Sequence, residues 1–237
     1  MMETAFDLES YLADGVEDIV SDILKTTLHN PKESCFMAQY AIQSKRAEKL
    51  RAAAQKRGQH IPPFLIASIT TQCNLHCKGC YARANHSCYD AAPVGNSPKL
   101  LGTEQWDSIF RQAADLGIGF ILLAGGEPLV RRDVLTAAGG YPGILFPVFT
   151  NGTMMDADYL ALLDEERNLI PIVSIEGKRE TTDARRGEGV YDRLHSTMRE
   201  RHNRGLLFGA SVTVTKENMD VFCPKPSSMS LVLPAAK

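Results

Sequence analysis

The sequence has few of the features that mark membrane, secreted or nucleic-acid-binding proteins. No window of its 237 residues reaches the run of about 18 apolar positions that a membrane-spanning helix requires. The first ten residues, MMETAFDLES, are acidic and lack the apolar segment of a secretory signal. Neither sign of charge dominates, because 26 Lys and Arg oppose 28 Asp and Glu. We therefore expect a protein that binds neither membranes nor nucleic acid.

Cysteine is also scarce, and its placement is informative. Six residues are cysteine, and four of them lie close together, at Cys73, Cys77, Cys80 and Cys88. A secreted disulfide scaffold would be short, cysteine-rich throughout and preceded by an export signal. A reducing cytoplasm is therefore the expected location, and there clustered cysteines more often serve metal or redox chemistry. Cys35 lies in a helical pattern and is expected to be a small buried apolar residue.

Residues 1–60 are expected to form a helical extension. Apolar residues between positions 8 and 24 recur with the period of an amphipathic helix. A second helix is expected to begin with Asn30 as its N-cap, Pro31 at its first position and Glu33 as the reciprocal capping residue, and to run to about residue 59. Acidic residues gather before position 24 and basic ones at 45–57, which indicates two solvated faces; a partner-binding arm is the alternative.

From residue 62 onward, short β-rich runs alternate with helical patterns. Strands are expected at residues 64–70, 119–124, 144–150, 170–175 and 206–215. Helices are expected at residues 103–116, with Thr103 as N-cap, and at 130–138, 156–167 and 190–203. This alternation predicts an α/β fold with a parallel sheet, wound either as a doubly wound sheet or as a barrel. In both architectures the chemistry gathers at the carboxyl ends of the strands.

The loop after the first expected strand holds three thiols in a C-x3-C-x2-C spacing, at Cys73, Cys77 and Cys80. Thiolates are the usual ligands of iron–sulfur clusters, and a [4Fe–4S] cluster takes four of them. Three protein ligands would leave one iron open to a substrate or cofactor, as catalytic zinc keeps one open position. Cys88 is interpreted as an ordinary thiol, because that iron must stay open.

Structural zinc is the alternative for these cysteines. Cys88, His76 or His86 would then be the fourth ligand. Structural zinc usually uses two paired cysteine motifs, and the second pair is missing here. The spacing therefore favours an iron–sulfur cluster over zinc.

Further motifs follow in order, and with the cysteines they make the sequence similar to the radical S-adenosylmethionine (radical SAM) superfamily. The GGEP segment at residues 125–128 follows the second expected strand, TNG at 150–152 follows the third, and SIEG at 174–177 follows the fourth. Residues 183–187 and 191–193 resemble a segment of SPASM-like members, which carry a further cluster-binding domain. The resemblance covers about residues 62–216 and implies a barrel of six βα units.

The resemblance also implies cofactors and a reaction. A [4Fe–4S] cluster on the three cysteines would bind S-adenosyl-L-methionine at its open iron and take electrons from a low-potential donor. Cleavage of the bound cofactor would give a 5′-deoxyadenosyl radical that abstracts hydrogen from an unknown substrate. Members with similar motifs often act on peptides or proteins, so a peptide or protein substrate is expected by analogy.

The same resemblance assigns contacts to S-adenosylmethionine. Gly125 and Gly126 lack Cβ atoms, so the backbone could approach the methionyl amino group, which Glu127 would help to hold. Arg186 would bind the methionyl carboxylate. Because Gly79 stands where the family often has an aromatic residue, the ring beside adenine would come from Tyr81. Side chains that would reach the methionine or ribose hydroxyls are Thr150, Ser174 and Glu176.

The expected organisation is a helical extension at residues 1–60, a partial radical SAM barrel of about five of six βα units at 61–220, and an irregular tail at 221–237. The tail has three prolines and no acid. Pro224 and Pro226 fall where the next helix should form. We interpret the tail as foreign to the fold, as a truncation or a shifted reading frame would make it. The alternatives to an active enzyme are a truncated inactive product and a non-catalytic iron–sulfur or zinc-binding module.

Overall fold

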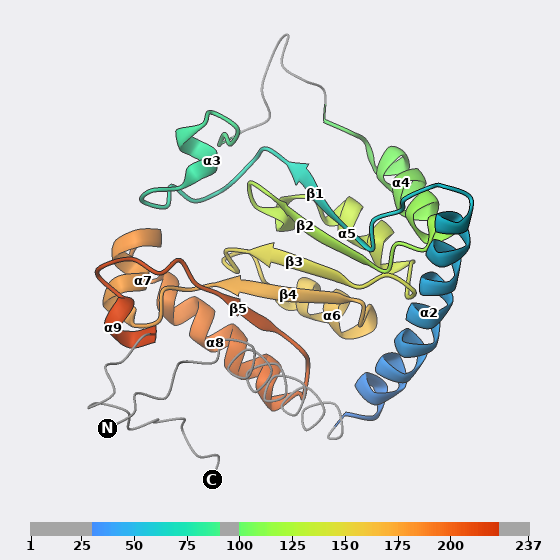
Figure 1. The fold of residues 1–237 in the computed structure, drawn as a ribbon. Coiled ribbons are helices and arrows are strands. Elements are labelled where there is room, and N and C mark those ends of the chain that lie inside the picture. Colours follow the sequence, from blue (N-terminus) through green and yellow to red (C-terminus); the bar gives the residue numbers. More distant parts are fainter. Residues whose placement is uncertain (1–29, 91–99, 223–237) are drawn as a thin grey trace, which may run out of the picture.

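A five-stranded parallel sheet forms the centre of the protein (Figure 1). The computed structural model describes residues 30–90 and 100–222. The strands follow one another in chain order across the sheet, and each neighbouring pair is parallel. They are β1 (Phe64–Thr70), β2 (Phe120–Gly125), β3 (Phe146–Thr150), β4 (Leu169–Ser174) and β5 (Gly209–Ser211). The expected α/β fold with five parallel strands is confirmed.

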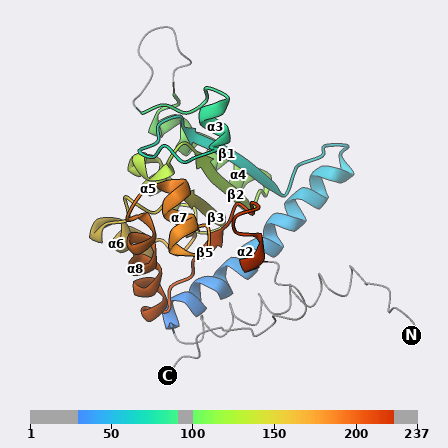
Figure 2. The same ribbon diagram turned by 90° about the vertical axis from the view of Figure 1, so that its left-hand side faces the viewer.

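Helices occupy the connections between the strands and both ends of the sheet. The cysteine loop, α3, α7 and α9 lie where the strands finish, whereas α2 runs past the opposite end (Figure 1); Figure 2 looks toward the carboxyl ends. The helices are α2 (Pro31–Lys56), α3 (Tyr81–Ala84), α4 (Thr103–Leu116), the 3-10 helix η1 (Pro128–Val130), α5 (Arg132–Gly139), α6 (Ala157–Glu165), α7 (Arg179–Arg186), α8 (Val190–Asn203) and α9 (Met219–Phe222).

The start of α2 confirms one capping prediction and corrects another. The Asn30 side chain accepts hydrogen bonds from the backbone N–H groups of Lys32 and Glu33, as an N-cap does. The Glu33 side chain does not cap the helix in return. It is buried, and its Oε2 lies 2.7 Å from Nη1 of Arg167, which precedes β4. The ion pair fastens α2 to the sheet, and it displaces the expected capping contact.

The cap of α4 also differs from the prediction. Gly102, not Thr103, is the N-cap, and its N–H donates to Oε1 of Gln105 at 2.9 Å. The Thr103 hydroxyl instead donates to Asp133 at the start of α5. Thr103 therefore joins two helices rather than capping one.

Other elements also differ from the prediction. The helix expected at 130–138 corresponds to α5, which begins at Arg132 and is preceded by η1. Helix α7 is not predicted, because its sequence RETTDARR has no apolar periodicity. The fifth strand was expected over residues 206–215, but β5 has only three residues. Beyond Ser211 the backbone leaves the ladder, and the N–H of Thr213 donates to a side-chain oxygen of Glu176.

The main core lies between the sheet and helices α4, α5 and α6. Along β2, buried residues alternate with half-buried ones, so one face of the strand is directed into this core. A smaller cluster lies beneath α8, with Val173, Val190 and Leu194. Members of the main core include Phe110, Ile121, Leu123, Val134, Leu135, Val148 and Leu163. Both cores support the strand ends that carry the sequence motifs.

Several predictions concern the ends of the chain. The helix expected at residues 8–24 and the part of the tail from 223 onward lie outside the described residues. Residues 221–222 belong to α9, so the tail expected from 221 begins in a helical turn. Cys35 is exposed on α2, and the prediction that it is buried is wrong. Among residues 30–90 and 100–222, no helix has the length and apolar character needed to cross a membrane.

Candidate functional site

The three cysteines of the motif lie in the loop that leaves the carboxyl end of β1. The N–H of Cys73 donates to the carbonyl of Tyr89, and the N–H of Cys80 donates to the carbonyl of Cys77. Arg83 donates to the carbonyl of Cys73 at 3.1 Å and forms a 2.8 Å ion pair with Asp90. These contacts hold the loop, although it has little regular structure.

The three thiols of the motif share this loop. Each of Cys73, Cys77 and Cys80 is half-buried and free of disulfides. Burial raises the pKa of Cys77, Arg186 opposes that rise, and the neighbouring thiols Cys73 and Cys80 add to it. In the described part of the chain, no three Cys, His, Asp or Glu side chains are close enough to hold a metal ion as they stand. Ligation by the three cysteines therefore stays a prediction.

Cys88 lies behind the loop. It is buried, and burial with the nearby Cys73 raises the pKa of its thiol to about 11. The interpretation of Cys88 as an ordinary thiol stays a prediction.

The GGEP segment joins the end of β2 to the beginning of the cysteine loop. The N–H of Gly126 donates to the Thr70 carbonyl at 2.8 Å, and the N–H of Glu127 donates to the Gln72 carbonyl at 2.7 Å. A Cβ on Gly125 would lie 2.3 Å from the Thr70 oxygen, and one on Gly126 would lie 2.1 Å from the Gln72 oxygen. The glycines are thus required by the close approach of the chain's own backbone, which the sequence did not reveal. Their contact with S-adenosylmethionine stays a prediction.

Glu127 connects the ends of β2 and β3. Its buried carboxylate accepts from the Thr150 hydroxyl at 2.6 Å, from the Asn151 N–H at 2.7 Å and from the Leu129 N–H at 3.0 Å. Burial raises the pKa of Glu127, and these donors oppose the rise. The Thr150 hydroxyl also accepts from the N–H of Gly152. Both predicted cofactor contacts, Glu127 and Thr150, therefore have protein partners at the edge of the site.

Asn151, in the TNG segment, reaches the first cysteine. Its Nδ2 lies 3.9 Å from Sγ of Cys73 and 2.9 Å from Oδ1 of Asn74, while its Oδ1 accepts from the N–H and hydroxyl of Thr153. The sequence pattern marked TNG as a motif of the superfamily and gave Asn151 no role. Only the fold, which brings the end of β3 beside the loop after β1, identifies this contact.

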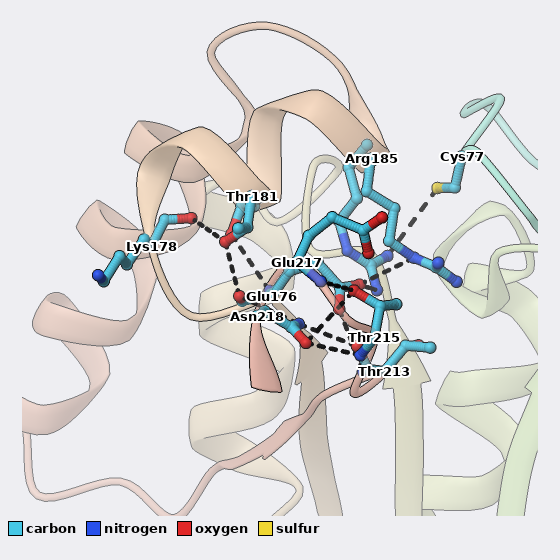
Figure 3. A network of polar contacts seen from close by, with 11 residues as sticks. Cys77, Glu176, Lys178, Thr181, Arg185, Thr213, Thr215, Glu217 and Asn218 are labelled. Carbon is cyan, nitrogen blue, oxygen red and sulfur yellow. Dashed lines mark hydrogen bonds and ion pairs between the residues drawn. The ribbon is translucent and has the colours of Figure 1, made fainter. Parts of the chain in front are cut away.

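Glu176, after β4, is the centre of a second polar network (Figure 3). Its buried Oε1 lies 2.7 Å from Nη2 of Arg186 and 3.1 Å from Nε of Arg185. Arg186 also directs Nη1 toward Sγ of Cys77, at 3.9 Å. The structure therefore brings together two predicted site residues and a cysteine, with the arginine charge placed between carboxylate and sulfur.

A cavity of about 390 Å³ adjoins this network. It lies between the cysteine loop, α7 and the segment after β5, and is lined among others by Lys78, Gly79, Glu176, Arg185 and Thr215. The N–H of Lys78 donates to the Arg185 carbonyl at 2.7 Å, so the loop and α7 are joined at its rim. The cavity offers room for an organic ligand beside Lys78 and Gly79 of the cysteine loop.

Ser174 and Tyr81, two further residues predicted to contact S-adenosylmethionine, differ in their exposure to solvent. Ser174 is half-buried at the end of β4, opposite Ser211 of β5. Tyr81 is 76% exposed at the start of α3 and is not among the residues that line the cavity. Gly79 has a φ of +68°, a conformation that strains an aromatic residue, which explains the glycine at this position. The contact of Tyr81 with adenine stays a prediction.

Comparison with known proteins gives a consistent result. The radical SAM superfamily profile matches residues 67–222. The chain is 31% identical over 160 residues to Fe-coproporphyrin III synthase of Methanosarcina barkeri, which covers 66% of this chain and 38% of that protein. It is 28% identical over 171 residues to the mycofactocin maturase MftC of Mycolicibacterium smegmatis, covering 70% and 41%. The chain thus spans about two fifths of the length of these curated relatives.

A solved structure supports the fold. Streptococcus suis SuiB bound to S-adenosylmethionine superposes with a TM-score of 0.57 at 19% identity, over 75% of this chain and 41% of SuiB. SuiB bound to its precursor peptide SuiA gives a TM-score of 0.56. This likeness confirms the expected partial barrel of the radical SAM type. Since the family profile matches more than half of its residues, the chain belongs to the radical SAM superfamily, whose cofactors are a [4Fe–4S] cluster and S-adenosylmethionine.

Proposed function

We propose that this protein is a radical SAM enzyme in which Cys73, Cys77 and Cys80 hold the cluster. The observation that carries the proposal is the placement of the three thiols. They lie in one loop at the carboxyl ends of the strands, the same end of the sheet as Glu127 and the Glu176–Arg186 pair. When bound, the reduced cluster supplies the electron that cleaves S-adenosylmethionine into methionine and a hydrogen-abstracting 5′-deoxyadenosyl radical.

The residues beside the thiols suit a cluster of this kind. Three thiolates bring negative charge into a half-buried loop, and Arg186 offers a guanidinium 3.9 Å from Cys77. The three-thiol set leaves one iron without a protein ligand, as binding of S-adenosylmethionine to that iron requires.

The cavity beside the loop is proposed to receive S-adenosylmethionine. Arg185 and Lys78 on its wall offer cationic groups for a carboxylate, and Ser174 and Glu176 lie at the adjoining strand ends. Gly125 and Gly126 bring the GGEP backbone against the loop. Glu127 and Thr150 would then shape this edge through their mutual hydrogen bond.

A peptide or protein is the proposed substrate class. The relatives include a mycofactocin maturase, and SuiB has been solved with a precursor peptide. Such a reaction also needs a low-potential electron donor, and a reducing cytoplasm would keep the free thiols available. The substrate proposal rests on these relatives, whereas the cluster proposal rests on the residues of the chain itself.

Anaerobic reconstitution tests the cluster and the cofactor together. The chain is supplied with iron and sulfide, then with S-adenosylmethionine and a strong reductant, and 5′-deoxyadenosine is measured. We expect turnover in the wild type and none in Cys77→Ala. Cys35→Ala is the matched control, because Cys35 is an exposed thiol on α2, at the far end of the sheet.

Other outcomes identify the alternatives. Stoichiometric zinc without iron would indicate a zinc-binding module and contradict the proposal. A stable cluster that never cleaves S-adenosylmethionine would indicate a truncated inactive product or a non-catalytic iron–sulfur module, and would also contradict the proposal. Retention of turnover in Cys77→Ala would remove that residue from the ligand set.

A further inference from the structure

Three side chains at the end of β3 and the start of the cysteine loop form a closed ring of hydrogen bonds. Nδ2 of Asn74 donates to the Thr153 hydroxyl at 2.9 Å, and that hydroxyl donates to Oδ1 of Asn151 at 2.7 Å. Nδ2 of Asn151 donates to Oδ1 of Asn74 at 2.9 Å and closes the ring. Each of the three side chains donates one hydrogen bond and accepts one within this ring.

The backbone fixes which way the Asn151 amide faces. The N–H of Thr153, which can only donate, points at Oδ1 of Asn151 at 3.0 Å. The other end of the side chain must therefore be the NH₂ group. One of its two hydrogens goes to Asn74, and the second is directed at Sγ of Cys73, 3.9 Å away.

Asn151 is also anchored on its main chain. Its N–H donates to the buried carboxylate of Glu127 at 2.7 Å, and the residue is 7% exposed. The turn that follows is held by the N–H of Gly152, which donates to the Thr150 hydroxyl at 2.9 Å. The side-chain donor is thus presented to the sulfur by a rigid support, since a simple exposed turn would leave the amide to water.

We propose that Asn151 is a positioning residue that acts on the cluster through Cys73. Its side-chain amide donates an N–H···S hydrogen bond to Cys73 and thereby raises the reduction potential of the cluster. The proposal rests on the function proposed above, because only a cluster bound through Cys73 can respond to this donor. A hydrogen bond to a ligating sulfur withdraws electron density and favours the reduced, more negative state of an iron–sulfur cluster. Asn151 therefore eases the one-electron reduction on which cleavage of S-adenosylmethionine depends.

The test compares the reduction potential of the reconstituted cluster in four chains, using EPR-monitored redox titration without S-adenosylmethionine. The chains are the wild type, Asn151→Ser, Asn151→Asp and Thr153→Val. In Asn151→Ser the sulfur loses its amide donor. At a fixed solution potential we expect the ratio of reduced to oxidised cluster to fall about fivefold, which converts to about 40 mV because tenfold is 59 mV for one electron. In Asn151→Asp the ratio of reduced to oxidised cluster should fall further, since the negative carboxylate facing the sulfur disfavours the more negative reduced state.

Thr153→Val is the matched control. It breaks the same ring, but the N–H of Thr153 and the amide of Asn151 remain, so the potential should stay within twofold of the wild-type ratio. The EPR line shape of the reduced cluster should change in the Asn151 variants and not in the control.

The possible failures are distinguishable. Absence of a cluster or of cofactor cleavage in the wild type would refute the proposed function. A wild-type enzyme that forms and uses the cluster, with Asn151→Ser at an unchanged potential, would refute the role of Asn151 alone. Loss of the cluster from both Asn151 variants, but not from Thr153→Val, would also overturn it, because a donor that tunes the cluster is not needed to hold it.

Discussion

Replacing Gly126 with alanine would place a methyl group against the start of the cysteine loop. The new Cβ would lie 2.1 Å from the Gln72 oxygen, 2.5 Å from the Gln72 carbonyl carbon and 3.1 Å from its nitrogen. All three are backbone atoms, so no side-chain rotation can relieve the contact. The end of β2 and residues 70–72 would have to separate.

The size of the effect follows from the contacts that this separation breaks. Two hydrogen bonds cross the gap, from the N–H of Gly126 to Thr70 and from the N–H of Glu127 to Gln72. Each contributes about 1 kcal/mol, and forced displacement in a packed region costs roughly 1–3 kcal/mol more. We expect a loss of about 3–5 kcal/mol in the free energy of unfolding, which lowers Tm by roughly 10 °C or more in a chain of this size.

Urea denaturation and thermal melting of the purified variants measure this loss. Gly143→Ala is the matched control, because its Cβ would lie 3.6 Å from Cβ of Gln43, an ordinary contact. The control should stay within about 0.5 kcal/mol of the wild type. If Gly126→Ala were as stable as Gly143→Ala, the close approach of the two backbones would not be the reason for the glycine.

Two further predictions concern charged groups away from the site. Arg167→Met should cost about 3–5 kcal/mol in urea unfolding, because it leaves Glu33 buried without its partner, whereas the double variant Glu33→Leu/Arg167→Met should regain much of this; equal losses in the two would contradict the pairing. The bidentate ion pair with Arg131 lowers the pKa of Asp133 to about 2, so its stabilising contribution is complete above the ordinary value of 3.8 and is lost as pH falls toward 2. For a carboxylate 46% exposed, screening reduces the contribution to about 1 kcal/mol. Asp133→Asn should therefore be less stable than the wild type at pH 7, and the gap should narrow as pH falls from 3.8 toward 2; a gap of constant size over this range would contradict the linkage.

The sequence predicted the strands best where burial imposes a local pattern. β1 has the expected bounds, and β2, β3 and β4 differ from expectation by one or two residues, because their apolar runs are continuous and their flanks are polar or glycine-rich. The sequence-based prediction was wrong where a contact with a residue distant in the chain determines the course of the backbone. The fifth strand is short because Thr213 bonds to Glu176, 37 positions earlier.

The site divides in the same way. The cysteine spacing and the GGEP segment are local signals, and they identified the family. The contact of Arg186 with Cys77 joins residues 109 positions apart, and the contact of Asn151 with Cys73 joins residues 78 apart. Neither pairing leaves a periodic pattern in the sequence. The sequence motif predicts that Gly125 and Gly126 allow the approach of a ligand, whereas the structure shows that the backbone of Thr70 and Gln72 leaves no room for a Cβ atom there.

The consecutive order of the strands has a consequence for the order of folding. Each strand pairs with the next one in the chain, so the sheet can grow through loops of moderate length, which close at low entropic cost. The cysteine loop is different, because Lys78 must meet Arg185, and Cys77 must meet Arg186, 109 positions away. The thiols therefore acquire their final surroundings only after β4 and α7 have docked. We expect a cluster delivered during synthesis to find an unfinished binding loop, and insertion to follow completion of the sheet.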